Sequence, residues 1–232
     1  MRKSGRERAK LATPQLITLA NALLGALAIM YIFDGACRLG ACLILICIIV
    51  DGLDGKIARL LKKESEFGRY LDSLADSISF CLAPAVLLYK SYYSLERGSA
   101  FYNLENAIVI VSIVFIIGFG ILRLARFAYE KEDKLKFFIG LPTPALAFFI
   151  VILYNLLNVP AIMIPICIIS FFMILKLKYP KIEGLYYTAT GLTAVILGLL
   201  SFIYPYFGII VIALILIYVF IAPFTIKKQI SF

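Results

Sequence analysis

The chain has 232 residues, of which 62% are hydrophobic and 16% charged, and its formal net charge is +9. Soluble domains carry ~45–50% apolar and ~25% charged residues. A water-soluble fold would therefore expose large apolar patches, and the same composition excludes a disordered chain. We expect an integral membrane protein, in which the basic residues report topology and not nucleic-acid binding.

Apolar runs bounded by charge, Gly or Pro predict an all-α membrane bundle, because about 20 apolar residues cross a bilayer as a helix. About eight spans are expected, with roughly these bounds: 14–33, 38–61, 66–91, 102–127, 142–158, 160–177, 187–203 and 205–226. The breaks before Pro160 and Pro205 are interpreted as tight turns, since the residue before proline disfavours the helical region. Six longer, kinked helices are the alternative.

The distribution of Lys and Arg predicts that both termini lie in the cytoplasm. With eight helices and a cytoplasmic N-terminus, all but three of the 23 Lys and Arg residues fall on the cytoplasmic side. The exceptions are Arg38, Lys90 and Arg97. This positive-inside bias fits an even number of spans. We expect a multi-pass protein of the cell membrane, with residues 1–232 forming one domain and residues 1–13 a basic cytoplasmic segment.

Four carboxylates stand within or beside the second and third predicted helices, where an Asp costs a few kcal/mol. They are Asp51, Asp54, Asp72 and Asp76. Each pair shares a helix face, at i,i+3 or i,i+4 spacing, and a short hairpin connection lets the two faces meet near the cytoplasmic end. Four like charges repel in a desolvated site, and two hard divalent cations would compensate them. An ion pathway is the alternative, because intramembrane acids also mark transporters.

Two glycines and an arginine lie on the same faces as these carboxylates. Gly55 is one turn beyond Asp51 and Gly68 one turn before Asp72, while Arg59 stands two turns past Asp51. Glycine inside a helix indicates close approach of a backbone or a ligand. The Arg59 guanidinium is a candidate clamp for a phosphate at the membrane surface.

This segment matches the pattern D-x2-D-G-x2-A-R-x8-G-x3-D-x3-D at every fixed position, and it resembles the signature of the CDP-alcohol phosphatidyltransferases. Enzymes of this family transfer a phosphatidyl group from a CDP-linked lipid to an alcohol and release CMP. The resemblance therefore implies a membrane transferase of phospholipid biosynthesis. It also implies a homodimer and a site with two divalent ions, Mg or Mn.

The resemblance implies a role for each residue of the pattern. Asp51 and Asp72 would bridge the two ions, Asp54 would complete the shell of the first ion, and Asp76 that of the second. Asp76 would also be the base that takes the acceptor's hydroxyl proton; the chain contains no histidine. The residues implied in binding the CDP-lipid, with Gln15 standing where the family pattern has Asn, are Pro14, Gln15, Thr18, Gly55, Ala58, Arg59, Ser65 and Gly68.

Stretches outside the pattern resemble the membrane-embedded phosphatidylserine synthases. They are PQLITLANALLGALAI, LDSLADSISFCLAPA, LRLARF, FFIGLPTPA and MILKLKYPKI. This resemblance implies L-serine as the acceptor and CDP-diacylglycerol or CDP-archaeol as the donor. Glycerol 3-phosphate and inositol phosphate are the alternative acceptors, and they would be expected to need a denser basic pocket.

Arg123 and Arg126 are candidate acceptor ligands. They stand at i,i+3 near the cytoplasmic end of the fourth predicted helix. Their guanidinium groups would bind the serine carboxylate or the lipid phosphate. The alternative is that they are helix-end cations, which the macrodipole and the topology both favour.

Overall fold

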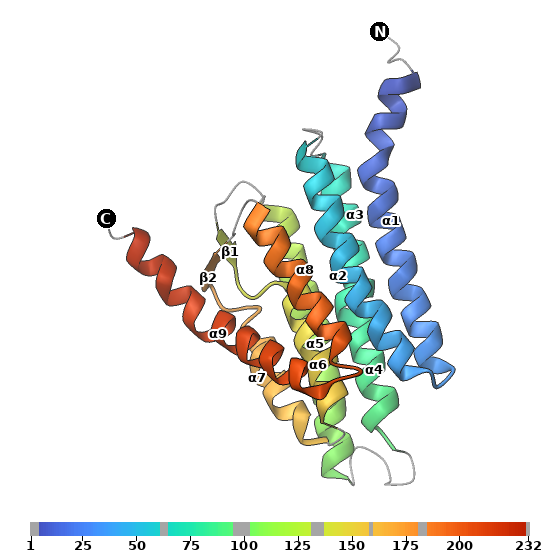
Figure 1. The fold of residues 1–232 in the computed structure, drawn as a ribbon, viewed down its shortest axis with the longest axis vertical. Coiled ribbons are helices and arrows are strands. Elements are labelled where there is room, and N and C mark those ends of the chain that lie inside the picture. Colours follow the sequence, from blue (N-terminus) through green and yellow to red (C-terminus); the bar gives the residue numbers. More distant parts are fainter. Residues whose placement is uncertain are drawn as a thin grey trace.

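The computed structural model describes residues 5–60, 65–94, 103–130, 137–157, 160–180 and 185–230, and this part of the chain is almost entirely helical (Figure 1). A π-helix, η1 (Ser77–Leu82), joins α3 to α4, and a single 3₁₀ turn (Pro160–Ile162) precedes α7. The α-helices are α1 (Gly5–Phe33), α2 (Cys37–Leu60), α3 (Glu66–Asp76), α4 (Ala83–Tyr92), α5 (Leu104–Glu130), α6 (Thr143–Leu156), α7 (Met163–Phe171), α8 (Leu185–Leu200) and α9 (Pro205–Ile230).

The prediction of a helical bundle is confirmed in that the described part is nearly all helical. Each of the eight predicted segments overlaps a helical stretch, with α3, η1 and α4 together forming the third. The first helix begins at Gly5, earlier than expected. Three described stretches are long and apolar enough to cross a membrane: Gln15–Phe33, Glu66–Tyr92 and Leu104–Tyr129. Many large apolar side chains are also exposed, for example on α1 and α9, which suits lipid as the surrounding solvent. These features indicate a membrane protein.

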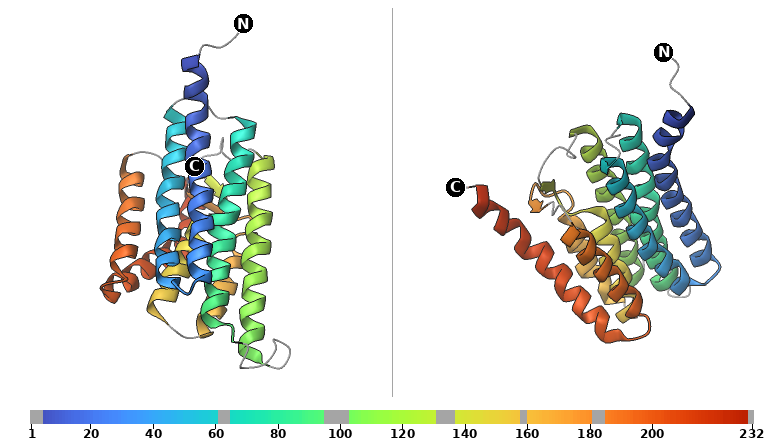
Figure 2. Two further views of the ribbon diagram at one scale, coloured as in Figure 1. Left: turned by 90° about the vertical axis from the view of Figure 1, so that its right-hand side faces the viewer. Right: turned by 45° about the horizontal axis from the view of Figure 1, so that its top comes forward.

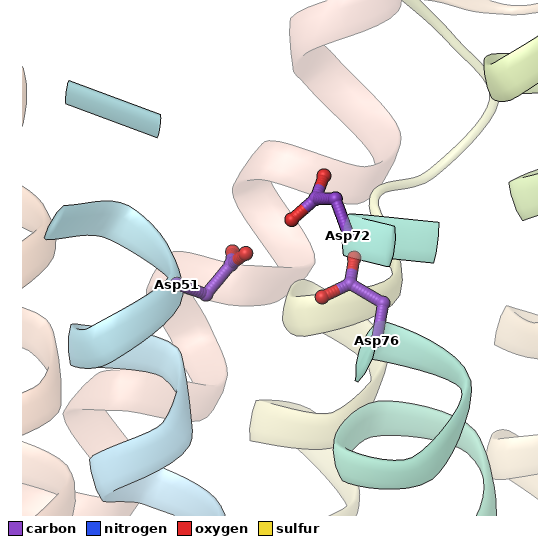
Figure 3. Close-up of side chains that lie close together, drawn as sticks. All are labelled: Asp51, Asp72 and Asp76. Atoms are coloured by element: carbon purple, nitrogen blue, oxygen red, sulfur yellow. The ribbon is translucent and has the colours of Figure 1, made fainter. Parts of the chain in front are cut away.

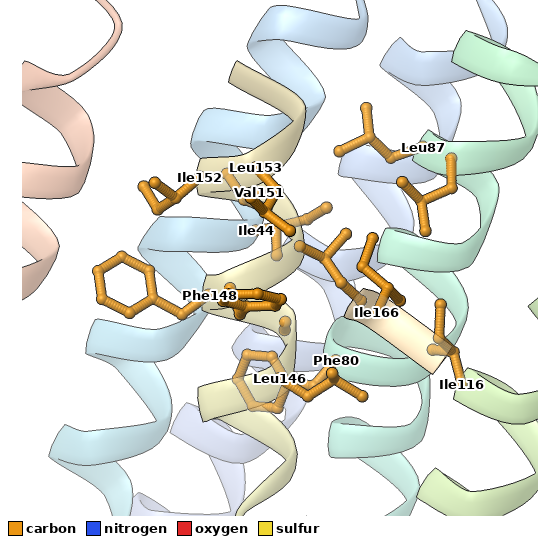
Figure 4. Packing of buried hydrophobic residues seen from close by; sticks show 14 of the residues in the cluster. Ile44, Phe80, Leu87, Ile116, Leu146, Phe148, Val151, Ile152, Leu153 and Ile166 are labelled. Atoms are coloured by element: carbon orange, nitrogen blue, oxygen red, sulfur yellow. The ribbon is translucent and has the colours of Figure 1, made fainter. Parts of the chain in front are cut away.

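The long helices pack side by side, and α6 packs against α2, η1, α7 and α9. In Figure 2, α1, α2, the α3–α4 stretch and α5 run alongside one another, while α9 leaves the bundle at an angle. The buried core includes much of α6, where Ile150, Val151 and Ile152 are fully buried. Side chains of α2, η1, α5 and α7 belong to the same cluster (Figure 4). Because lipid tails are as apolar as these side chains, close van der Waals packing is what holds such helices together.

The sequence did not predict a small sheet near one end of the bundle. Strand β1 (Phe137–Ile139) pairs antiparallel with β2 (Lys178–Pro180), with Phe138 opposite Tyr179. The Tyr179 hydroxyl donates to the carbonyl of Val219 on α9 at 3.1 Å, and burial raises the pKa of Tyr179 to about 12. The phenol joins β2 to α9 through this hydrogen bond.

The prediction that the sixth helix reaches residue 177 is wrong, because α7 ends at Phe171. Beyond that residue the main-chain carbonyls find partners far away in the sequence. The carbonyl of Phe172 accepts from Leu141 N at 3.1 Å, and the carbonyl of Leu177 accepts from Gly140 N at 2.8 Å. Gly140 has φ +80, and a Cβ there would collide with the carbonyl of Met173. These tertiary bonds replace the helical ones.

Candidate active site

Three of the four predicted metal-binding carboxylates converge in the structure. Asp51 on α2 faces Asp72 and Asp76 on α3 (Figure 3), and each offers an oxygen within 4.8 Å of the other two. Asp54 belongs to α2, but its side chain lies outside the described part. The predicted meeting of the two helix faces is therefore observed for these three residues.

The N-terminus of α3 is fixed by a local cap. Ser65 is the N-cap residue, and its hydroxyl oxygen accepts a hydrogen bond from Gly68 N at 2.9 Å. Glu66 in the first turn suits the positive end of the helix dipole. A Cβ at Gly68 would lie 3.0 Å from Ser65 Oγ, so glycine gives this bond its space. Capping is thus the structural role observed for Ser65 and Gly68, and their contact with the CDP-lipid stays a prediction.

A π-helix begins immediately after Asp76. It runs over Ser77–Leu82, and Ser79 and Phe80 within it are buried. Wide helical turns of this kind occur frequently at functional sites, because the extra residue changes which side chains face a neighbouring helix. The sequence did not predict this feature, since the mostly apolar residues 78–88 also suit an ordinary helix.

The three carboxylates suit a divalent cation. The Asp76 side chain is only 7% exposed, and Asp51 and Asp72 are half-buried. Like charges so close together repel each other, and withdrawal from water adds a further cost. An oxygen-only donor set of this kind is what Mg²⁺ and related hard cations prefer. The residues present therefore fit the metal that the family resemblance implies.

The remaining predicted CDP-lipid residues lie on α1 and α2. Thr18 is buried, at 6% exposure, and Gln15 is half-buried. Gly55 is exposed, and a Cβ there would have no described protein atom within 4 Å. The contact of Gly55 with the CDP-lipid therefore stays a prediction. The side chains of Pro14, Ala58 and Arg59 lie outside the described part, although these residues belong to helices.

The two predicted acceptor ligands differ in their surroundings. Arg123 is buried, at 5% exposure; its Nη1 donates to Thr143 Oγ1 at 3.4 Å, and its guanidinium lies 5.9 Å from the centre of the Phe127 ring. Arg126 donates to three main-chain carbonyls, those of Ile139 at 2.6 Å, Ile174 at 3.2 Å and Met173 at 3.3 Å. Arg126 thus fixes the chain around Gly140, which places Thr143 beside Arg123.

The chain was also compared with known proteins. The model of the CDP-alcohol phosphatidyltransferase family matches residues 11–175. A CDP-diacylglycerol--serine O-phosphatidyltransferase of Methanocaldococcus jannaschii is 36% identical over 204 residues, which cover 84% of this chain and 90% of that protein. The archaetidylserine synthase of Methanothermobacter thermautotrophicus is 33% identical over 182 residues, 75% of this chain and 72% of that protein.

A third relative comes from Bacillus subtilis. Its CDP-diacylglycerol--serine O-phosphatidyltransferase is 34% identical over 170 residues, which cover 73% of this chain and 90% of that protein. The chain belongs to the CDP-alcohol phosphatidyltransferase family, as the Asp pattern predicts, and it is a transferase.

Proposed function

We propose that this chain transfers the phosphatidyl group of a CDP-linked lipid to L-serine and releases CMP. The observation that carries the chemistry is the meeting of Asp51, Asp72 and Asp76 within 4.8 Å. Three relatives that are named as serine O-phosphatidyltransferases or as an archaetidylserine synthase support serine as the acceptor. The lipid donor is CDP-diacylglycerol or CDP-archaeol.

In this proposal Asp51, Asp54, Asp72 and Asp76 hold two divalent cations, Mg or Mn. When bound, such ions neutralise charge on the non-bridging phosphate oxygens. The serine hydroxyl oxygen forms a bond to the phosphorus of the phosphatidyl group, the bond from that phosphorus to the CMP oxygen breaks, and CMP leaves with the electron pair. Asp76 takes the hydroxyl proton. The nucleotide is bound by the predicted residues of α1, α2 and the start of α3.

The direct test is CMP release by the purified protein, supplied with CDP-lipid and Mn²⁺, with each alcohol added in turn. We expect release with L-serine and little with glycerol 3-phosphate or inositol phosphate. Faster release with either phosphorylated alcohol would replace serine as the acceptor. Absence of release with every alcohol would contradict the proposed activity.

Arg123 is the proposed ligand of the serine carboxylate, since it is the buried cation on the helix that packs against α3 and η1. A charge-assisted hydrogen bond contributes ~1.5–3 kcal/mol, so Arg123→Gln should raise the KM for serine about 10–100-fold. The KM for CDP-lipid should change little.

Arg126→Gln is the matched comparison, because the same change is made one turn away. We expect it to lower thermal stability more than it changes the serine KM, since it removes bonds to three main-chain carbonyls. An unchanged serine KM in Arg123→Gln would contradict the assignment of Arg123.

We also propose that the protein spans the cell membrane several times and that its active site faces the cytoplasm. The support is the charge distribution. With eight helices and a cytoplasmic N-terminus, only Arg38, Lys90 and Arg97 among the Lys and Arg residues fall on the outer side. Tags at the N- and C-termini should both report from the cytoplasm. A C-terminal tag outside the cell would require an odd number of spans.

The homodimer implied by the family is tested by the mass of the detergent-solubilised protein.

A further inference from the structure

Asn21 on α1 carries a fully buried amide that finds no hydrogen-bond partner. Its side chain is 0% exposed, and neither Oδ1 nor Nδ2 has a partner among the residues that the structure describes. Native proteins rarely bury an unsatisfied polar group, and each exception calls for an explanation, such as a bound ion or water. Here the donor and the acceptor of one amide are both unsatisfied.

The main chain places Asn21 next to the carboxylate cluster. Its carbonyl accepts from Ser79 Oγ at 3.0 Å and from Cys47 Sγ at 3.8 Å. Ser79 follows Asp76 by three residues and Cys47 precedes Asp51 by four, so each stands about one helical turn from a carboxylate. Asn21 therefore lies in the layer beside the cluster, on the side of the α1–α2 turn.

A glycine allows this close approach of α1 to η1. A Cβ at Gly25, one turn after Asn21, would lie 2.5 Å from Ser79 Oγ and 2.9 Å from Ser79 Cα. Any side chain at this position would push the two helices apart. The small residue at the contact keeps the Asn21 main chain within reach of Ser79.

The two groups that reach the Asn21 main chain leave its side-chain amide unsatisfied. Nδ2 is a donor, and an ionised carboxylate can accept from it; Oδ1 needs a donor. The Ser79 hydroxyl and the Cys47 thiol both donate to the Asn21 carbonyl, and ionised Asp51 and Asp76 carry no proton. Since no described group donates to Oδ1, a donor brought by a ligand would satisfy it. A hydration water of a divalent cation, with its strongly polarised O–H groups, is such a donor.

We propose that Asn21 is a positioning residue of the cation site. With the cation bound, its Nδ2 would donate to the carboxylate of Asp51 or Asp76, and its Oδ1 would accept from a hydration water of that cation. Groups just outside the ligands orient them in this way, and removing such a group typically weakens metal binding 10–100-fold. This inference rests on the proposed function, because that function requires the cation.

The test is Asn21→Leu, which keeps a similar volume and removes both polar atoms. Thermal unfolding of the detergent-solubilised protein is followed in EDTA and across a Mn²⁺ titration. In EDTA the variant should unfold at the same temperature as the wild type or at a higher one, because no group loses a partner. The Mn²⁺ concentration at half-maximal stabilisation should rise about 10–100-fold.

Asn106→Leu is the matched control. Asn106 is also 0% exposed, but its side-chain amide donates to Ser94 O at 2.8 Å and accepts from Ser94 N at 3.2 Å. This variant should lower the unfolding temperature in EDTA, because Ser94 loses both of those bonds. Its Mn²⁺ midpoint should equal that of the wild type.

Each contrary result has a distinct meaning. An unchanged Mn²⁺ midpoint in Asn21→Leu, with a responsive wild type, overturns the role of Asn21 and leaves the proposed function standing. A loss of stability in EDTA as large as that of Asn106→Leu shows that the Asn21 amide is structural, and it also overturns the proposal. A wild type that Mn²⁺ does not stabilise overturns both the cation site and the role of Asn21.

Discussion

Asp51→Asn is expected to reduce serine-dependent CMP release by at least about 10³-fold. Asp51 is the carboxylate that α2 contributes opposite Asp72 and Asp76 (Figure 3). A neutral amide oxygen binds a divalent cation much more weakly, and such an ion supplies several kcal/mol of transition-state stabilisation. Each 1.36 kcal/mol changes a rate tenfold. The measurement is CMP release at saturating substrates, together with Mn²⁺ affinity.

The same variant should not destabilise the metal-free protein. It removes one of three like charges that stand within 4.8 Å of one another, so repulsion decreases and the unfolding temperature in EDTA should hold or rise. Asp34→Asn, an identical change at an exposed residue of the α1–α2 turn, is the control and should keep wild-type activity. Near-normal CMP release in Asp51→Asn would exclude the proposed cation site.

Asp76→Asn is expected to lower turnover about 10²–10⁴-fold, the usual contribution of a general base. Asp76 is 7% exposed and lies at the end of α3, directly before the π-helix. Asparagine keeps the size and one acceptor oxygen but cannot take the serine proton. CDP-lipid affinity should persist, because Asp51, Asp54 and Asp72 still hold at least one cation. Lipid affinity and CMP release are measured on the same preparation.

The two Asp variants separate the proposed roles. Asp51→Asn should lose cation affinity and turnover together, whereas Asp76→Asn should lose mainly turnover. If CDP-lipid binding disappears with activity in Asp76→Asn, this residue is mainly a metal ligand. If activity stays above about a tenth of the wild type, which is far less than the loss expected for a base, another group or water removes the proton.

The sequence by itself determined the helical stretches and the carboxylate cluster of the site. Long apolar runs bounded by charge and proline identify helices because both the length and the breaks are local properties. The pairs Asp51–Asp54 and Asp72–Asp76 could be placed on helix faces because the α-helical period fixes side chains at i,i+3 and i,i+4. A hairpin between the two helices then leaves little freedom, and the structure brings Asp51, Asp72 and Asp76 together.

Tertiary structure alone decided the features whose partners are distant in sequence. The sixth helix ends at Phe171 because Leu141, Gly140 and Arg126 supply hydrogen bonds to the carbonyls that follow. No local pattern predicts the π-helix after Asp76, since its apolar residues suit an ordinary helix equally well. The unsatisfied amide of Asn21 is likewise a property of three packed helices and not of any one of them. Side-chain burial and hydrogen bonding depend on what lies across the interface, and that information is not contained in the local sequence.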